Sequence, residues 1–297
     1  MKKLFLSMDR GILTTSDMKL KRYKILYGVM FGILSIYCLS CLIPVVWILL
    51  SGFKDVKELY SIPATFFPKQ IDLSKLGRIW REMEFQSSYI NTLIMAVGAV
   101  AADIVITGLA GYVLSRLKPV GTKLFFTVCF WTMLLPATMR TVPLYMVMKD
   151  LPIFHISLLD TYWPIWIIAA ANAFNIILFK NFFDGVPMGV VEAAKIDGAS
   201  NLRIFFRIMI PLSVPAIMTV GILSFNGQLG QFFWPYLFIT DKNMTVIGVK
   251  VYQMKSSNFT MDYQMLAIIF TCLPQMLIFA VFSKYIIGGL NAGAVKG

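Results

Sequence analysis

Residues 192–211 read EAAKIDGASNLRIFFRIMIP, a polar stretch that separates long apolar segments of the chain. Pro187, a few residues upstream, suits the first turn of a helix, where its missing N–H leaves no hydrogen bond unmade. Gly198 is placed to end that helix, because glycine adopts the left-handed conformation of a helix C-terminus without steric cost. Ser200 can cap a second helix. The stretch therefore predicts two helices joined by an elbow.

The second predicted helix is amphipathic. Its apolar residues recur at helical spacing and would form one stripe, made of Leu202, Phe205, Phe206, Met209 and Ile210. Arg203 and Arg207 fall together on another face. A helix with these two faces is expected to lie at a membrane surface rather than across the membrane.

The composition indicates a membrane protein. Of the 297 residues, 58% are hydrophobic and 14% are charged, whereas about a quarter of the residues of a soluble protein are charged. The net charge of +12 does not indicate a nucleic-acid partner, because the basic residues are dispersed between apolar runs. We therefore expect an all-α integral membrane protein in contact with a lipid bilayer and not with nucleic acid.

Six apolar runs are long enough to cross a bilayer, for which about 20 residues suffice. They are Ile25–Leu50, Tyr89–Leu114, Leu124–Met148, Thr161–Phe183, Val214–Ile239 and Met265–Ile287. The chain is thus divided into an N-terminal tail (1–24), a six-span domain (25–287) with a polar loop at about 185–211, and a C-terminal tail (288–297). Most of the 27 lysines and arginines flank one side of these spans, which places both tails and the polar loop in the cytoplasm.

Two spans carry polar side chains that could line a path through the membrane. Asn172 and Asn175 share one face of the fourth span. The fifth span has a glycine-rich polar belt followed by aromatic residues, with candidate lining residues Asn226, Gln228, Gln231 and Trp234. The alternative for each amide is a hydrogen bond that only bridges two helices.

Two ionisable residues also lie inside spans, where a charge is costly. Asp103 is either a functional site or the acceptor of a structural hydrogen bond from a neighbouring helix. Arg140 lies in the third span between Pro136 and Pro143, which predict a bend there. Its side chain either faces a water-filled path or extends to the surface or to a neighbouring chain.

No catalytic chemistry is indicated. The only histidine, His155, lies between spans, and the chain contains no HExxH, no GxSxG and no phosphate-binding Gly-Lys-Ser/Thr motif. We therefore expect a transport protein that is not itself an enzyme and that binds neither a metal nor a cofactor.

The polar loop resembles the cytoplasmic signature loop of ABC importer permeases. That pattern has Glu-Ala-Ala, a glycine four positions later and, further on, a hydrophobic pair before proline. Here the pattern is met by Glu192-Ala193-Ala194, Gly198, Ile208 and Ile210-Pro211. Isoleucine stands at position 210 where leucine is usual, a swap that conserves volume. We call residues 185–211 the signature loop.

Further segments are similar to the carbohydrate branch of these permeases, in particular to the second membrane subunit of maltose-type importers. They are Asn91-Thr92, residues 110–116 (AGYVLSR), Pro143-Leu144, residues 232–235 (FFWP) and the C-terminal residues 288–297. One segment departs from the pattern, since Leu229-Gly230 stands where many relatives have Trp-Asn.

The resemblance implies a type I ABC importer permease fold and alternating-access import of a sugar or oligosaccharide across the cell membrane of a bacterium or archaeon. It also implies three partners: a second homologous permease subunit, a dimeric cytoplasmic ATPase that uses ATP and Mg, and an extracytoplasmic solute-binding protein. Residues expected to couple the chain to the ATPase are Glu192, Ala193, Ala194, Asp197, Gly198, Ala199, Arg203 and Arg207. The alternatives are an importer of a non-sugar solute and an ion-coupled secondary transporter, which would need ionisable residues at mid-membrane.

Overall fold

The computed structural model describes residues 21–256 and 259–294, and within these ranges all regular secondary structure is helical. The chain forms two compact units. The first contains the chain up to Leu73 together with Met261–Leu266, and the second contains Ser74–Thr260 and the chain from Ala267 onward. Apolar helices of membrane-spanning length confirm the predicted all-α membrane protein.

The first unit is built on one long apolar helix. Helix α2 (Lys21–Phe53) exposes nearly all of its hydrophobic side chains, as expected of a helix that faces lipid. The short helix α3 (Val56–Leu59) follows it. Lys54 is buried, donates to the carbonyl of Thr65 and lies 4.3 Å from the ring centroid of Trp47. These contacts fix the polar segment that begins where α2 ends.

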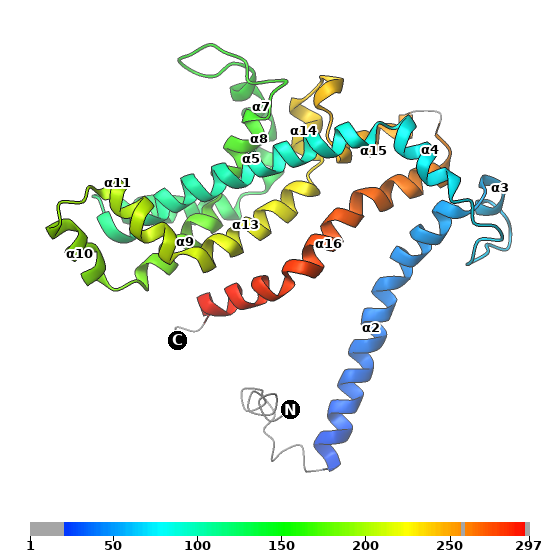
Figure 1. The fold of residues 1–297 in the computed structure, drawn as a ribbon, viewed down its shortest axis with the longest axis horizontal. Coiled ribbons are helices and arrows are strands. Elements are labelled where there is room, and N and C mark those ends of the chain that lie inside the picture. Colours follow the sequence, from blue (N-terminus) through cyan, green and yellow to red (C-terminus); the bar gives the residue numbers. More distant parts are fainter. Residues whose placement is uncertain (1–20, 257–258, 295–297) are drawn as a thin grey trace. The chain divides into compact units, whose positions relative to one another are not determined.

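The second unit is organised around α5 (Phe85–Tyr112), which continues as the π-helix η3 (Val113–Leu117). Helices α8 (Trp163–Ala170), α9 (Ala173–Asp184) and α13 (Val214–Leu229) pack against α5, as Figure 1 shows. Glycine makes the closest approach possible: a Cβ at Gly111 would lie 2.8 Å from the Cβ of Phe179 and 2.9 Å from the backbone nitrogen of Lys180. The small residues of α5 therefore let α9 pack directly against its backbone.

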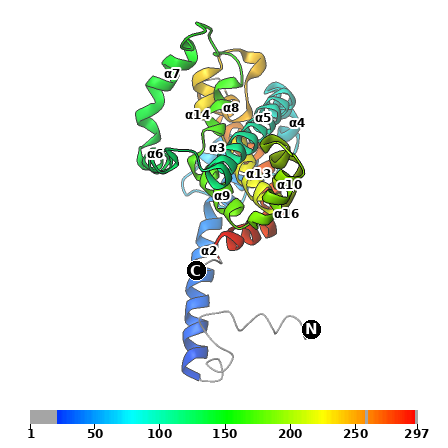
Figure 2. The ribbon, with the colours of Figure 1, turned by 90° about the vertical axis from the view of Figure 1, so that its left-hand side faces the viewer.

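The other helices precede or follow α5 in the chain, and the last of them belongs to both units. Helix α4 (Ser74–Glu82) precedes α5, and α6 (Thr122–Leu134), η4 (Ala137–Arg140) and α7 (Thr141–Lys149) follow it; α6 and α7 are seen most clearly in Figure 2. The signature loop contains α10 (Met188–Ile196), α11 (Asn201–Ile204), η5 (Phe205–Met209) and α12 (Ile210–Leu212). The chain ends with α14 (Phe233–Phe238), η6 (Lys242–Met244), α15 (Ile247–Gln253), η7 (Met254–Ser256) and α16 (Met261–Ala294).

Six spans result when each bent pair of helices is taken as one crossing. Three helices are long and apolar enough by themselves, namely α2, α5 with η3, and α16. Three pairs are bent at a short break: α6 with η4–α7 by 103°, α8 with α9 by 46°, and α11–α12 with α13 by 80°. The predicted bend in the third span is confirmed, and it lies at Pro136, directly after α6 ends.

Several boundaries differ from those that the sequence predicted. The fourth span breaks at Asn172, whose side chain caps α9 by accepting from the N–H of Asn175. The fifth breaks at Gly230, where α13 ends before α14 begins. Helix α16 continues past Gly288 to Ala294. Most of the predicted tail 1–24 lies outside the described residues.

One exposed carboxylate ties α8 to α14. The backbone N–H of Asp160 donates to the carbonyl of Phe238 at 2.9 Å, and its side chain accepts from the backbone of Thr240 and Asp241 at 2.5 and 3.0 Å. These hydrogen bonds, the one from the Thr240 N–H above all, hold the pKa of Asp160 below its usual value. The contact fixes the connection between two spans that are far apart in the sequence.

Candidate functional site

The elbow of the signature loop has the predicted geometry. Gly198 has a φ of 76°, which a residue with a side chain rarely adopts. The N–H groups of Gly198 and Ala199 donate to the carbonyls of Lys195 and Ala194, the hydrogen-bond pattern of a Schellman motif. The Ser200 hydroxyl accepts from the N–H of Arg203 at 3.3 Å, so Ser200 caps α11. The predicted helix end and the predicted cap are both confirmed.

Helix α10 exposes one face and buries the other. Glu192, Ala193 and Asp197 are exposed, as a surface for a partner requires. Ala194 is 8% exposed and belongs to the hydrophobic cluster beneath the loop, so it packs within this chain instead of facing a partner. Ile196 is 86% exposed and is not among the residues that the resemblance assigned to coupling. Ile196 lies four residues after Glu192, and residues at this spacing share a helix face. The sequence alone could therefore have placed Ile196 beside Glu192.

The second helix of the loop departs from ideal α-geometry. Residues Phe205–Met209 are π-helical, which changes the rotation of the side chains that follow. Phe205 and Met209 of the predicted stripe are fully buried, but Leu202 and Phe206 are exposed, and Ile204 takes a buried place instead. Arg203 and Arg207 are both exposed, as predicted. The stretch Asn201–Met209 therefore presents two arginines and two large apolar side chains outward.

An aromatic cluster beneath the loop connects it to α5 and α9. The ring of Tyr112 lies 5.5 Å from that of Phe205 and 6.2 Å from that of Phe183, measured between centroids. Phe179 and Phe183 stack at 5.9 Å. The three phenylalanines are fully buried. A close-packed cluster of this kind has low compressibility, so it joins the loop firmly to α5 and α9.

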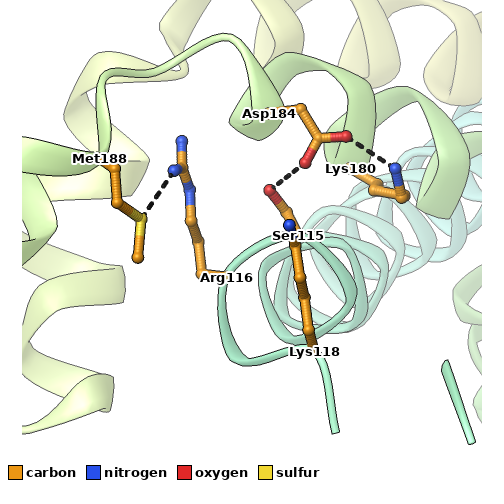
Figure 3. A pocket seen from close by; sticks show the side chains of 6 residues that line it. All are labelled: Ser115, Arg116, Lys118, Lys180, Asp184 and Met188. Carbon is orange, nitrogen blue, oxygen red and sulfur yellow. Dashed lines mark hydrogen bonds and ion pairs between the residues drawn. The ribbon is translucent and has the colours of Figure 1, made fainter.

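Polar contacts reinforce this connection, as Figure 3 shows. Arg116, near the end of η3, donates to the carbonyls of Phe183 and Val186, the two sides of the turn that leads from α9 into α10. Ser115 donates to Asp184 at 2.6 Å, and Lys180 contacts the other oxygen of that carboxylate at 2.7 Å. A cavity of about 340 Å³ lies among these side chains and Met188. The segment AGYVLSR thus attaches the signature loop to the second span.

Asp103 has a hydrogen-bond partner within the second unit. Its side chain is 1% exposed and accepts from the amide of Asn175 at 2.7 Å. This hydrogen bond joins α5 to α9. It is the structural hydrogen bond from a neighbouring helix that was one of the two alternatives for Asp103. Asn175 is consequently buried between helices and is not among the residues that line the cavity described next.

A second cavity, of about 510 Å³, lies where the third, fourth and fifth spans are broken. Its lining includes four of the six residues predicted for a path, Asn172, Gln228, Gln231 and Trp234. Asn226 and Asn175 are outside it. Arg140 and Thr132 add polar groups, and apolar residues of α6, α8 and α9 complete the wall. The Gln228 Oε1 atom is buried and accepts no hydrogen bond from any residue that the structure describes.

Arg140 reaches this cavity because the third span is broken. Pro136 follows the end of α6, η4 covers Ala137–Arg140, and α7 begins at Thr141. The Arg140 side chain lines the cavity and has no hydrogen bond or ion pair within residues 21–256 and 259–294. The sequence placed an arginine inside a span, and only the fold brings it to Gln231 and Trp234.

The chain is similar to known permeases over most of its length. It is 28% identical to the diacetylchitobiose uptake system permease protein NgcG of Streptomyces coelicolor, over 89% of this chain and 87% of that protein. It is 28% identical to the polygalacturonan/rhamnogalacturonan transport system permease protein YtcP of Bacillus subtilis, over 90% and 96% respectively. Among solved structures, a bacterial ABC transporter involved in the import of the acidic polysaccharide alginate matches with a TM-score of 0.73 and 27% identity, covering 93% of this chain and 99% of that one.

These likenesses agree with the predicted type I permease fold and with a transport role. Residues 11–290 match a family that is described as the binding-protein-dependent transport system inner membrane component. The match takes in all the described spans and the signature loop. The chain is therefore a multi-pass membrane protein that belongs to the family of binding-protein-dependent transport system inner membrane components.

Proposed function

We propose that this chain is the permease subunit of an ABC importer that carries a sugar or oligosaccharide across the cytoplasmic membrane of a bacterium or archaeon. The observation that carries the proposal is the cavity at the breaks of the third, fourth and fifth spans. Relatives named for diacetylchitobiose uptake and for polygalacturonan transport support a saccharide as the solute.

The cavity has the chemistry of a saccharide site. Sugars present hydroxyl groups and apolar ring faces, so a passage for them needs amides and aromatic surfaces. Asn172, Gln228 and Gln231 supply amides, and Trp234 supplies an aromatic side chain. The wall therefore offers hydrogen-bond donors and acceptors beside an aromatic surface, as a saccharide requires.

The energy for import must come from other subunits, because the sequence contains no nucleotide-binding motif. We propose that the exposed face of α10, with Glu192, Ala193, Ile196 and Asp197, seats in a cytoplasmic ATPase dimer that hydrolyses ATP with Mg. Ile196 would enter an apolar pocket, and Glu192 would pair with a basic group. Arg203 and Arg207 would steady the second helix of the loop. The contacts of Arg116 and the aromatic cluster then pass the motion to α5 and α9.

Two further partners complete the proposed complex. A solute-binding protein delivers the saccharide from outside the membrane, in keeping with the description of the family. A second, homologous permease subunit forms the other half of the path, so that the cavity opens alternately to either side. The signature loop lies in the cytoplasm, as the distribution of lysine and arginine predicts.

The test is uptake by the complete complex in lipid vesicles. We expect accumulation of a saccharide that requires ATP and the binding protein, and that continues when an uncoupler removes ion gradients. An ATPase inhibitor should stop it. Uptake that an uncoupler abolishes and an ATPase inhibitor leaves intact would replace the proposal with ion-coupled transport.

A further inference from the structure

We propose that Arg140 makes the cavity selective for anionic saccharides, those that carry carboxylates such as uronic acids. The inference rests on the proposed function, because it names the class of substrate for the same cavity. Arg140 would bind a sugar carboxylate while the neighbouring amides and Trp234 hold hydroxyls and a ring face.

The charge balance of the cavity points to an anionic ligand. Arg140 is the only charged side chain among the residues that line it, and the other polar groups there are the amides Asn172, Gln228 and Gln231 and the hydroxyl of Thr132. No aspartate or glutamate lines the wall, so an anion would meet no repulsion from it. Within the described residues, Arg140 makes no ion pair or hydrogen bond that would neutralise it.

An arginine in this place keeps its charge. The guanidinium group does not lose its proton under physiological conditions, so deprotonation cannot relieve the cost of a cation within a membrane unit. Since no described residue of this chain supplies a counter-charge, water, a ligand or the second permease subunit must supply it. The planar fork of the guanidinium matches the two oxygens of a carboxylate through two parallel hydrogen bonds, and a carboxylate is the acidic group of a uronic acid.

The backbone supports a fixed position for this charge. Proline at 136 ends α6, and the chain then turns through η4 into α7, so that Arg140 stands at the first turn of a new helix. A continuous helix would give this position a different direction. Because the third span is broken, the Arg140 side chain reaches the wall of the cavity. Residues of the fourth and fifth spans complete that wall.

The direct test is ligand binding to the purified complex of permease subunits and ATPase, without the binding protein, whose own preference would otherwise intervene. The probes are a galacturonate trisaccharide and its carboxyl-reduced, neutral counterpart. We expect the acidic probe to bind about tenfold more tightly, and Arg140→Gln to remove that preference while Arg140→Lys retains part of it. Lys149→Gln, in the same span but outside the cavity, is the matched control and should retain the preference.

A second measurement does not depend on a saccharide. In a variant without the native cysteines, Gln231→Cys places a thiol on the cavity wall, and its reaction rates with an anionic sulfonatoethyl and a cationic trimethylammonioethyl methanethiosulfonate are compared. We expect the ratio of anionic to cationic rate to fall about tenfold when Arg140→Gln is added, and to stay unchanged with Lys149→Gln.

The outcomes separate the two proposals. Equal binding of both probes, or a reagent ratio that Arg140→Gln does not alter, overturns the role of Arg140 even if the complex imports a saccharide. A complex that imports no saccharide overturns the proposed function, while the reagent ratio still reports whether Arg140 sets the potential of the cavity. If the Arg140 side chain extended to the membrane surface instead, both probes would bind equally well and Arg140→Gln would not alter the reagent ratio.

Discussion

The cluster beneath the signature loop and the cavity at the broken spans are built in opposite ways. Beneath the loop, Phe179, Phe183 and Phe205 are fully buried, and Arg116 holds the turn between α9 and α10 by its carbonyls. Around the cavity, three spans are interrupted, at Pro136, Asn172 and Gly230, and amide side chains line the space between the helix ends. Close packing suits a region that must transmit force, and interrupted helices lined by polar side chains suit one that must accept a solute.

This difference predicts that substitutions in the packed region act on stability and coupling, whereas substitutions in the cavity act on the solute. The buried contact between Asp103 and Asn175 belongs with the first region, since it joins α5 to α9. Variants placed in each region can break or sharpen the comparison.

The largest effect is expected at the elbow. Gly198→Val puts a β-branched residue at a φ of 76°, which costs about 1–3 kcal/mol of local strain and moves α10. Transport and binding-protein-stimulated ATP hydrolysis should both be lost while the protein still inserts into the membrane. Gly121→Val, at a φ of 93° in a turn outside the signature loop, is the matched strain control and should keep both activities. Normal activity of the Gly198→Val complex would remove the coupling role from the loop.

A substitution where α5 meets α9 should lower stability. The Cβ of Gly111→Ala would press against the backbone of Lys180, and such overpacking costs about 1–3 kcal/mol. Gly227→Ala is the control, because a Cβ there has no heavy atom within 4 Å, and alanine favours a helix by about 1 kcal/mol. Thermal unfolding of the detergent-purified complex should show a lower midpoint for Gly111→Ala only. Equal midpoints would mean that the two helices separate easily.

In the cavity we expect a smaller effect, on transport alone. Gln231→Ala removes an amide from the wall, and the loss of one hydrogen bond of about 1 kcal/mol corresponds to about a fivefold lower transport rate at low substrate concentration. Asn226→Ala, on the same span but outside the cavity, should change the rate less. Neither variant should alter the unfolding midpoint. A reversed order of the two rates would place the path on the other face of α13.

The smallest effect is expected at Asp160, whose pKa is lowered in the folded chain. A lowered pKa contributes stability that is present above the unfolded value of about 3.9 and is lost as the pH falls through the folded value. The unfolding midpoint of Asp160→Asn should therefore lie below that of the native complex at pH 6, and the gap should close on acidification. Asp55→Asn is a control, because the exposed Asp55 carboxylate accepts no hydrogen bond from the described residues. If the difference in unfolding midpoint between the two proteins did not vary with pH, the stabilisation would not come from the lowered pKa of Asp160.

Some of this arrangement could be read from local signals. Runs of about 20 apolar residues mark the spans, Pro136 marks the bend in the third, and Gly198 and Ser200 mark the elbow. Each of these effects acts within a few residues of the chain. For this reason the sequence alone determined the class of protein, the count of spans and the two-helix form of the signature loop.

The places of the functional side chains were decided by contacts between distant segments. Asn175 pairs with Asp103, Ile204 is buried while Phe206 is exposed, and Arg140 joins Gln231 and Trp234 around one cavity. None of these follows from helical periodicity, because a π-helical turn and three broken spans change which face each residue presents. The spacing of apolar residues shows that a helix has two different faces. Only the packing of α8, α9 and α13 on α5 decides which face contacts protein, lipid or a solute.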